Sequence, residues 1–328
     1  MNLIDDIYYD KRYIELYLKP NEEIFEFEYK KDDNIFYNIA IKKPINKIGN
    51  ITVSDNYYDL ETVYGYGGIY CNSKDEIFLE KALKRYEEYC YSENIIAEFT
   101  RFHPFNNIHY NCTGFFDLLI NDRQTVYIDT TLSKENRWAN YTSKMRNILR
   151  KCEKELTFVR SNNIDNFIHL YESTMKKNNA EEFYFFDKEY FINLLNLKNV
   201  ELYEVLYKDT VISSSFFMFS KEFGHYHLSA NNYEYRKYNA NYMILDSIFD
   251  ISNSKDIPLF HLGGGRTNEE DDLLLKFKEK FSSHKEDFFI AGKVFNQDIY
   301  SKYINTWENQ TKNKIKYFLK YRLEIENE

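Results

Sequence analysis

The hydrophobic and polar positions of the chain follow one pattern twice. In the first stretch, residues alternate with period two over Phe25–Tyr29, and the chain returns as Ile35–Ile41 after the polar residues 31–34. Such a run on each side of a short polar turn predicts a β-hairpin. The pattern then predicts a helix near Glu76–Tyr91 and a strand over Ile95–Phe102.

The second stretch has the same succession of elements. Two runs, Leu202–Tyr207 and Val211–Phe219, flank the turn residues Lys208 and Asp209 and predict another hairpin. A strand, a helix and a further strand are then predicted over His225–Ala230, Asn239–Ile251 and Pro258–Leu262. We interpret the two stretches as a repeat of one α/β unit. The predicted fold is therefore α/β, with two similar lobes packed around a cleft.

A long helix over Lys134–Lys154 is predicted to join the lobes. Its Trp138, Tyr141, Met145, Ile148 and Cys152 recur at steps of three and four residues and predict one buried stripe. We therefore divide the chain into an N-terminal lobe, 1–155, and a C-terminal lobe, 156–328.

Three more helices are predicted in the C-terminal lobe. A helical pair over Ile164–Lys177 and Lys188–Leu197 opens it, with Asn163 and Asp187 as N-caps. The last helix is predicted over Gln297–Tyr321 and has a basic end.

Charge and composition disfavour several classes of function. The net charge of −9 disfavours general nucleic-acid binding, and the four cysteines form no C-x-x-C pair. The chain begins with acidic residues instead of an apolar leader, and no window has the length of apolar residues that a membrane helix needs. We therefore expect a cytoplasmic protein without a membrane span.

Glycines among tyrosines mark the first candidate site. Tyr64, Tyr66 and Gly67 lie in a segment whose glycines allow a ligand to approach the main chain closely. The tyrosine rings have the size and hydroxyl groups to stack on a base or a sugar and to donate hydrogen bonds. A structural turn with packed rings is the alternative interpretation.

Arg101 and His103 form the second candidate site. They share one face of a predicted strand that ends at Pro104. Ligands often bind at strand ends in α/β sheets. Arginine there suits a phosphate or carboxylate, and histidine can take a proton near neutral pH. A structural histidine is the alternative interpretation.

A cationic stripe forms the third candidate site. Arg146, Arg150 and Lys154 recur every fourth residue along the predicted long helix, so they lie on one face. A solvated charged face is the usual meaning of such a run. Anion binding is the other meaning, and the stripe is a candidate for binding the donor.

The fourth candidate site is the strongest. A buried strand runs into Gly263, Gly264, Gly265 and Arg266, and an acidic stretch and a leucine-rich helix follow. Consecutive glycines predict a tight, exposed backbone turn. Phe277 and Lys278 come downstream, where the ammonium group can lie at the mouth of the predicted cleft. No G-K-[ST] follows, so the turn is not a phosphate-binding P-loop.

These motifs, in this order over nearly the whole chain, resemble the FemAB family. The resemblance rests on Tyr-Gly-Tyr-Gly-Gly, on the Ser-Lys-x-Arg-Asn-x-x-Arg-Lys helix and on the segment from Leu-Gly-Gly-Gly to Phe-Lys-x-x-Phe. The family contains peptidoglycan-bridge aminoacyltransferases and related acyltransferases with two GNAT-like domains. The resemblance implies a tandem GNAT fold and acyl transfer to an amine, with Lys278 aiding the transfer step.

The chain departs from the family pattern at two places. His103-Pro104 falls where many members carry Asp-Pro, and the long helical arm of some members is missing. We expect His103 to act as a base and Arg101, Tyr64 and Tyr66 to hold an anionic acceptor. That acceptor is expected to be a nucleotide-sugar, glycan or peptidoglycan precursor of the cell envelope.

The donor is the remaining question. The glycine-containing pyrophosphate loop of coenzyme A enzymes is missing between Asn231 and Asn241, although a helix N-terminus there can still bind a phosphate. The acidic net charge favours acyl-CoA, and aminoacyl-tRNA, bound by Arg146 and Arg150, is the alternative. No metal is expected, because His225 and His227 lack an evident third ligand. A catalytically inactive binding module is the alternative from another class.

Overall fold

The chain divides into two compact units. A computed structural model describes residues 2–177, 185–269 and 271–325. The central unit consists of Asp5–Ile7 and Arg123–Glu286, and the terminal unit consists of Asn2–Ile4, Tyr8–Asp122 and Asp287–Glu328. The sequence placed the division after residue 155. The chain instead changes unit after Asp122 and again after Glu286.

Two exchanged strands explain these crossing points. β8 (Leu118–Asp129) follows the terminal unit in sequence, but its residues 125–129 pair with β13 (Leu259–Gly264) of the central unit. β14 (Lys285–Val294) follows the central unit, but its residues 290–294 pair with β7 (Ile95–Arg101). Each unit therefore completes its sheet with a strand from the other half of the sequence, which periodicity cannot predict.

The central unit has a six-stranded order, β9-β10-β11-β12-β13-β8, in which β12 and β13 are parallel and the other pairs antiparallel. Its remaining strands are β9 (Leu156–Ser161), β10 (Val200–Tyr207), β11 (Thr210–Phe219) and β12 (Phe223–Asn231). The predicted hairpin of β10 and β11 is confirmed. Lys208 takes the left-handed conformation in its turn, with φ of 53°.

The parallel strands β12 and β13 separate towards their carboxyl ends. Their pairing begins at Phe223↔Leu259 and ends at His225↔His261. β12 continues to Asn231 and β13 to Gly264, with no further pairing between them in the described residues. The two strands therefore diverge at that end of the described sheet.

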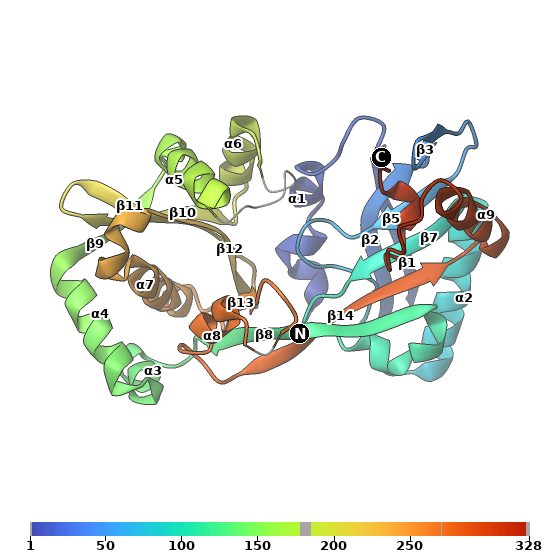
Figure 1. The fold of residues 1–328 in the computed structure, drawn as a ribbon. Helices are drawn as coiled ribbons and strands as arrows, with labels where there is room; N and C mark the ends of the chain where they lie inside the picture. Colours follow the sequence, from blue (N-terminus) through green and yellow to red (C-terminus); the bar gives the residue numbers. More distant parts are fainter. Residues whose placement is uncertain (1, 178–184, 270, 326–328) are drawn as a thin grey trace. The chain divides into compact units, whose positions relative to one another are not determined.

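Helices cover both faces of the central sheet (Figure 1). α5 (Ile164–Lys177) and α6 (Lys188–Asn196) lie on one face, and α4 (Ser143–Glu155) and α7 (Ala240–Ser254) lie on the other. Consecutive side chains of β11 lie on opposite faces of the sheet and belong to two different cores. Phe216 contacts Phe167 of α5 with ring centroids 4.7 Å apart, whereas Phe217 belongs to the cluster around Phe249 of α7.

The predicted joining helix is two helices, and both belong to the central unit. α3 (Lys134–Asn140) ends before Tyr141, and the Thr142 side chain caps α4 by accepting a hydrogen bond from Met145 N. The predicted stripe is largely buried, but it packs against α7 instead of joining two units. The N-cap prediction for Asp187 is confirmed, because its carboxylate accepts a hydrogen bond from Tyr190 N.

The terminal unit repeats the central pattern with the order β1-β2-β5-β7-β14, and only β5 and β7 are parallel. Its other strands are β1 (Glu23–Lys31), β2 (Asn34–Pro44), β5 (Tyr58–Glu61), β6 (Tyr70–Cys71), which pairs with β2, and the small hairpin of β3 (Lys47–Ile48) and β4 (Ile51–Thr52). The predicted first hairpin is confirmed, since Lys31 pairs with Asn34. The predicted repeat of one α/β unit is therefore present.

Consecutive residues of β7 also face two cores. Ile95 packs towards α2 (Glu76–Ser92), and Ile96 packs towards α9 (Gln297–Glu308). α9 is shorter than the predicted helix over Gln297–Tyr321. The remaining helices are α1 (Lys11–Glu15), α8 (Leu273–Lys278) and the 3₁₀ helices Leu3–Asp5, Ile7–Tyr9, Ile108–Asn111, Thr113–Phe115, Tyr233–Tyr238 and Lys320–Arg322. Among the described helices, none combines the length and apolarity needed to cross a membrane.

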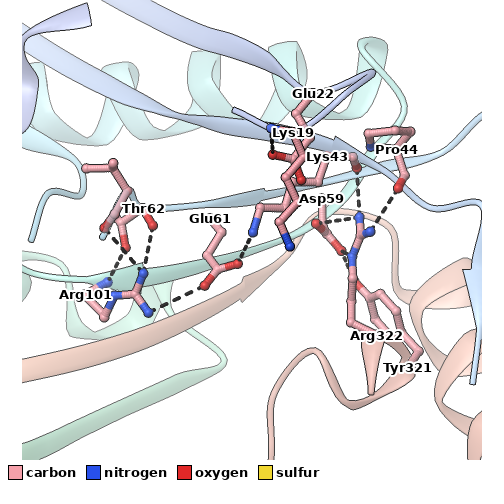
Figure 2. A network of polar contacts seen from close by, with 11 residues as sticks. Lys19, Glu22, Lys43, Pro44, Asp59, Glu61, Thr62, Arg101, Tyr321 and Arg322 are labelled. Atoms are coloured by element: carbon pink, nitrogen blue, oxygen red, sulfur yellow. Dashed lines mark hydrogen bonds and ion pairs between the residues drawn. The ribbon is translucent and has the colours of Figure 1, made fainter. Parts of the chain in front are cut away.

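A buried ion pair fixes the end of the chain to the terminal sheet (Figure 2). Asp59 of β5 is fully buried, and Arg322 approaches it twice, with Nε–Oδ2 at 2.7 Å and Nη2–Oδ1 at 2.8 Å. Tyr321 donates a third hydrogen bond to Asp59 Oδ2 at 3.0 Å. Arg322 also donates to the carbonyls of Lys43 and Pro44. This residue is therefore part of the fold and not of a free basic surface for tRNA.

Replacing Arg322 by alanine is expected to destabilise the terminal unit by about 3–5 kcal/mol, because Asp59 would stay buried without its counter-charge. Urea unfolding, followed by the fluorescence of Trp307 in a Trp138→Phe background, measures the loss. Lys314→Ala, an exposed position in the same segment, is the control and should change stability by less than about 0.5 kcal/mol. Equal stability of the two variants would contradict the structural role of Arg322.

Candidate functional site

The glycine turn after β13 is built by close approach. Gly263 has φ of 75°, a left-handed conformation that glycine adopts without strain. A Cβ atom on Gly264 would lie 2.9 Å from the Gln124 carbonyl oxygen, and one on Gly265 would lie 2.6 Å from Asp272 Cγ. The need for small residues here is therefore steric. The predicted tight, exposed turn is only partly present, because Gly263 and Gly264 end β13, the turn begins at Gly265, and all three glycines are partly buried.

Charged side chains hold the carbonyls of the turn. Lys278 Nζ donates a hydrogen bond of 2.6 Å to Gly264 O. Arg123 Nη1 donates to Gly265 O at 3.2 Å and to Arg266 O at 3.1 Å. Two basic side chains therefore face the negative ends of three consecutive peptide dipoles.

A carboxylate holds the amides of the turn. Asp272 Oδ2 accepts hydrogen bonds from Arg266 N at 3.0 Å and from Thr267 N at 3.1 Å. Asp272 is also the N-cap of α8, because its Oδ1 accepts from Leu274 N and Leu275 N, both at 2.9 Å. The six-residue helix thus carries the turn's carboxylate at one end and Lys278 at the other.

Aromatic packing keeps α8 in place. The Phe277 ring lies 5.1 Å from Tyr242 of α7 and 5.5 Å from Phe281, measured between ring centroids. Leu275 belongs to the same core cluster. A helix this short is not stable alone, so tertiary packing determines where Lys278 lies.

Lys278 is buried, with an exposed fraction of 6%. Burial lowers its pKa from 10.5 to about 7, and the charge of Asp272 acts in the opposite direction. The side chain therefore exists in both protonation states near neutral pH. Such a group can stabilise a developing negative charge or exchange a proton.

Neutral polar groups occupy β12 beyond the point where it leaves β13. His227 Nε2 lies 3.2 Å from the Tyr190 hydroxyl. Burial lowers the His227 pKa to about 3, so the imidazole is neutral at physiological pH. His225, still inside the paired region, hydrogen-bonds to Asp6 at 2.8 Å. The diverging strand therefore presents uncharged hydrogen-bonding groups.

The predicted donor residues have separate local roles. Asn231 ends β12, and its backbone N–H donates a hydrogen bond to the Thr174 hydroxyl oxygen at 3.2 Å. Asn241, in the first turn of α7, accepts a hydrogen bond on its Oδ1 from the Ser213 hydroxyl at 3.5 Å. Arg146 caps the end of α3 by donating to the carbonyls of Trp138 and Tyr141. Arg150 is exposed and contacts Asn147. Arg146 therefore holds the end of α3 and is not part of a freely exposed cationic stripe.

The predicted acceptor residues lie together in the terminal unit. The Tyr66 and His103 rings are 6.1 Å apart between centroids, and both contact Tyr8. Gly67 binds the chain next to them, since Gly67 N donates to Arg101 O at 2.8 Å and His103 N donates to Gly67 O at 3.0 Å. The sequence therefore selected residues that fold into one cluster.

Two of these residues have internal functions. Tyr64 stacks on Tyr17 at 5.8 Å, and its carbonyl accepts from Tyr13. Arg101 donates to the carbonyls of Thr62 at 2.9 Å and Val63 at 3.3 Å, and it lies 3.5 Å from Glu61 (Figure 2). These contacts favour a structural role for Arg101, so its binding of an anionic acceptor remains a prediction.

Sequence reasoning missed Asp272 and Arg123. Asp272 had a detectable signal, because an aspartate directly before Leu273–Leu275 is a typical N-cap. Arg123 had none. It lies far from the turn in sequence and reaches it only because β8 pairs with β13.

Comparison with known proteins agrees with this architecture. Residues 139–278 match the family model of the acetyltransferase (GNAT) domain, a range that ends at Lys278. This part of the central unit is therefore similar to the acetyltransferase (GNAT) domain. No curated protein sequence matches the chain significantly.

Solved structures extend the likeness to both units. FemX superposes with a TM-score of 0.70 at 13% identity, over 89% of this chain and 93% of FemX. The C-terminal domain of a putative lysylphosphatidylglycerol synthetase from Agrobacterium fabrum has a TM-score of 0.54 at 13% identity, over 88% of each chain. L-PGS from Bacillus licheniformis has 0.52 at 12% identity, also over 88% of each chain. The chain has the GNAT-type acyltransferase fold, and the predicted FemAB-like resemblance is confirmed for the fold.

The lowered pKa of Lys278 predicts how stability depends on pH. Between about pH 7 and pH 10, an unfolded chain holds a proton on this lysine that the folded protein lacks, so folding becomes more favourable as pH rises. The Lys278→Met variant has no ionisable group at this position, so its stability lacks this contribution to the pH dependence. The free energy of unfolding of the wild type, minus that of the variant, should therefore increase by several kcal/mol from pH 7 to pH 10. Urea unfolding at several pH values measures it, and a constant difference would contradict the buried titration.

Proposed function

We propose that this protein is an N-acyltransferase that uses acyl-CoA to acylate an amine of a nucleotide-sugar, glycan or peptidoglycan precursor of the cell envelope. The observation that carries the proposal is the placement of Lys278. It is a buried lysine, bound to the glycine turn at the carboxyl end of β13, inside a GNAT-type domain.

The strand geometry supports a donor site in the central unit. β12 and β13 separate after His225 and His261, and such a divergence of parallel strands suits the entry of an extended ligand with amide groups. Pantetheine, the arm of coenzyme A, has this chemistry. In the terminal unit, the corresponding strands β5 and β7 stay paired to Glu61↔Phe99, and the bridge Gly67↔Phe102 continues the pairing.

The proposed reaction is a transfer between a thioester and an amine. The neutral amine attacks the thioester carbonyl carbon, the new N–C bond forms, and the C–S bond breaks with coenzyme A thiolate as the leaving group. Protonated Lys278 stabilises the oxyanion that develops, or the donor's phosphate. His103 is the proposed base for the amine proton, and Tyr66 belongs to the proposed acceptor site. Orientation of amine and carbonyl supplies a further part of the rate.

Lys278→Met is expected to lower turnover by roughly 100-fold or more, the usual scale for losing one charge-stabilising donor. The assay measures coenzyme A release from acetyl-CoA with a panel of UDP-amino sugars and peptidoglycan precursors. Lys276→Met, an exposed position on the same helix, is the matched control and should keep full turnover. Full activity of Lys278→Met in a folded protein would sink the catalytic role.

The donor is tested by direct titration with acetyl-CoA and with aminoacyl-tRNA, each at low and moderate salt. Acetyl-CoA should bind saturably, while tRNA should bind weakly because the net charge is −9 and Arg322 and Arg146 have internal partners. Saturable tRNA binding that falls steeply with salt, without acetyl-CoA binding, would indicate an aminoacyl-tRNA donor instead. Binding of neither donor, with no transfer, would indicate an inactive binding module.

A further inference from the structure

The N-cap of α8 carries a full charge that capping does not require. Asparagine and serine cap helices about as well as aspartate does. Burial tends to raise the Asp272 pKa, but hydrogen bonds from four backbone N–H groups outweigh it, so the pKa lies below its ordinary value. Asp272 is therefore a carboxylate at neutral pH, and in the described residues no ion pair neutralises it.

The other charged groups near the turn have partners of their own, so Asp272 is the counter-charge of Lys278. Glu279, the next residue, forms an ion pair with Lys285 at 2.5 Å. Lys280 donates to the Tyr242 hydroxyl, and Arg123 is occupied by two turn carbonyls. Within the described ranges, Lys278 has no carboxylate within ion-pair distance, and Asp272 is the charge that acts on it through space.

The turn connects the two groups mechanically as well. Asp272 holds the amides of Arg266 and Thr267, and Lys278 holds the carbonyl of Gly264. The two side chains lie at the two ends of the same six-residue helix, so a shift of the Asp272 cap shifts the anchor of Lys278. Gly265 approaches Asp272 so closely that a side chain at position 265 has no room.

We propose that Asp272 is a positioning residue for Lys278: its carboxylate fixes the glycine turn and keeps the lysine protonated, so that Lys278 acts as a charge stabiliser and not as a base. The catalytic consequence rests on the proposed acyl transfer. The electrostatic coupling does not, and it can be measured without any substrate.

The test follows the Lys278 side chain by NMR. Protein labelled with ¹³Cε-lysine is titrated, and the Lys278 resonance is assigned by its disappearance in Lys278→Met. In Asp272→Asn the titration midpoint should fall by roughly half a pH unit or more, because an attractive charge is lost while the cap remains. Asp271→Asn is the control, an exposed neighbouring carboxylate, and should leave the midpoint unchanged. Asp272→Ser is the second variant, which keeps a capping oxygen if the first does not fold.

A midpoint that stays at the wild-type value in both folded Asp272 variants would overturn the proposal. With acetyl-CoA and an accepted amine, the alkaline limb of the kcat/KM pH profile should move to lower pH together with the NMR midpoint. A limb that stays fixed while the midpoint moves would overturn the role of protonated Lys278. If the wild type transfers nothing, the proposed function fails, and the NMR titration still decides whether Asp272 controls Lys278.

Discussion

The cost of removing a charge from water governs both units of this protein. A buried charge persists only where a counter-charge or backbone dipoles replace the lost hydration. Asp59 meets this condition through Arg322 and Tyr321, and the pair fixes the end of the chain to the terminal sheet. Asp272, which is only partly buried, is stabilised by four backbone N–H groups. Lys278 has only a carbonyl and a distant carboxylate, so its pKa falls to about 7.

This difference separates structural charges from chemically useful ones. The paired arginines Arg101 and Arg322 each have both carbonyl and carboxylate partners, which suits rigid architecture. Lys278 has one hydrogen bond and a pKa near the working pH, which suits a group that must respond to charge developing in a reaction. The same physical rule thus produces a structural ion pair in the terminal unit and a candidate reactive group in the central unit.

The two units also show how one α/β pattern gives two different sheets. In both, a helix connects two parallel strands, and an exchanged strand pairs antiparallel with the second of them. β5 and β7 remain paired through Glu61↔Phe99, whereas β12 and β13 part after His225↔His261. Of these two parallel pairs, the second is the one whose strands diverge before both of them end. The proposed donor site therefore follows from strand divergence and not from a glycine-rich phosphate loop.

The sequence by itself determined the local elements and the glycine turn. The hairpins at residues 31–34 and 208–209, the Asp187 cap and the left-handed conformation of Gly263 all follow from periodicity, turn chemistry and backbone conformation, which act over a few residues. The sequence also marked Lys278 as the residue to follow.

Only the tertiary structure decided which distant groups meet. The exchange of β8 and β14 moved the unit boundaries away from residue 155 and brought Arg123 to the glycine turn. Arg146 became a cap for α3, although its spacing on the helix predicted an exposed stripe. Spacing along a chain identifies which residues share a face, but burial and partner choice depend on contacts between segments far apart in sequence. Those contacts set the pKa of Lys278, and with it the chemistry that the residue can perform.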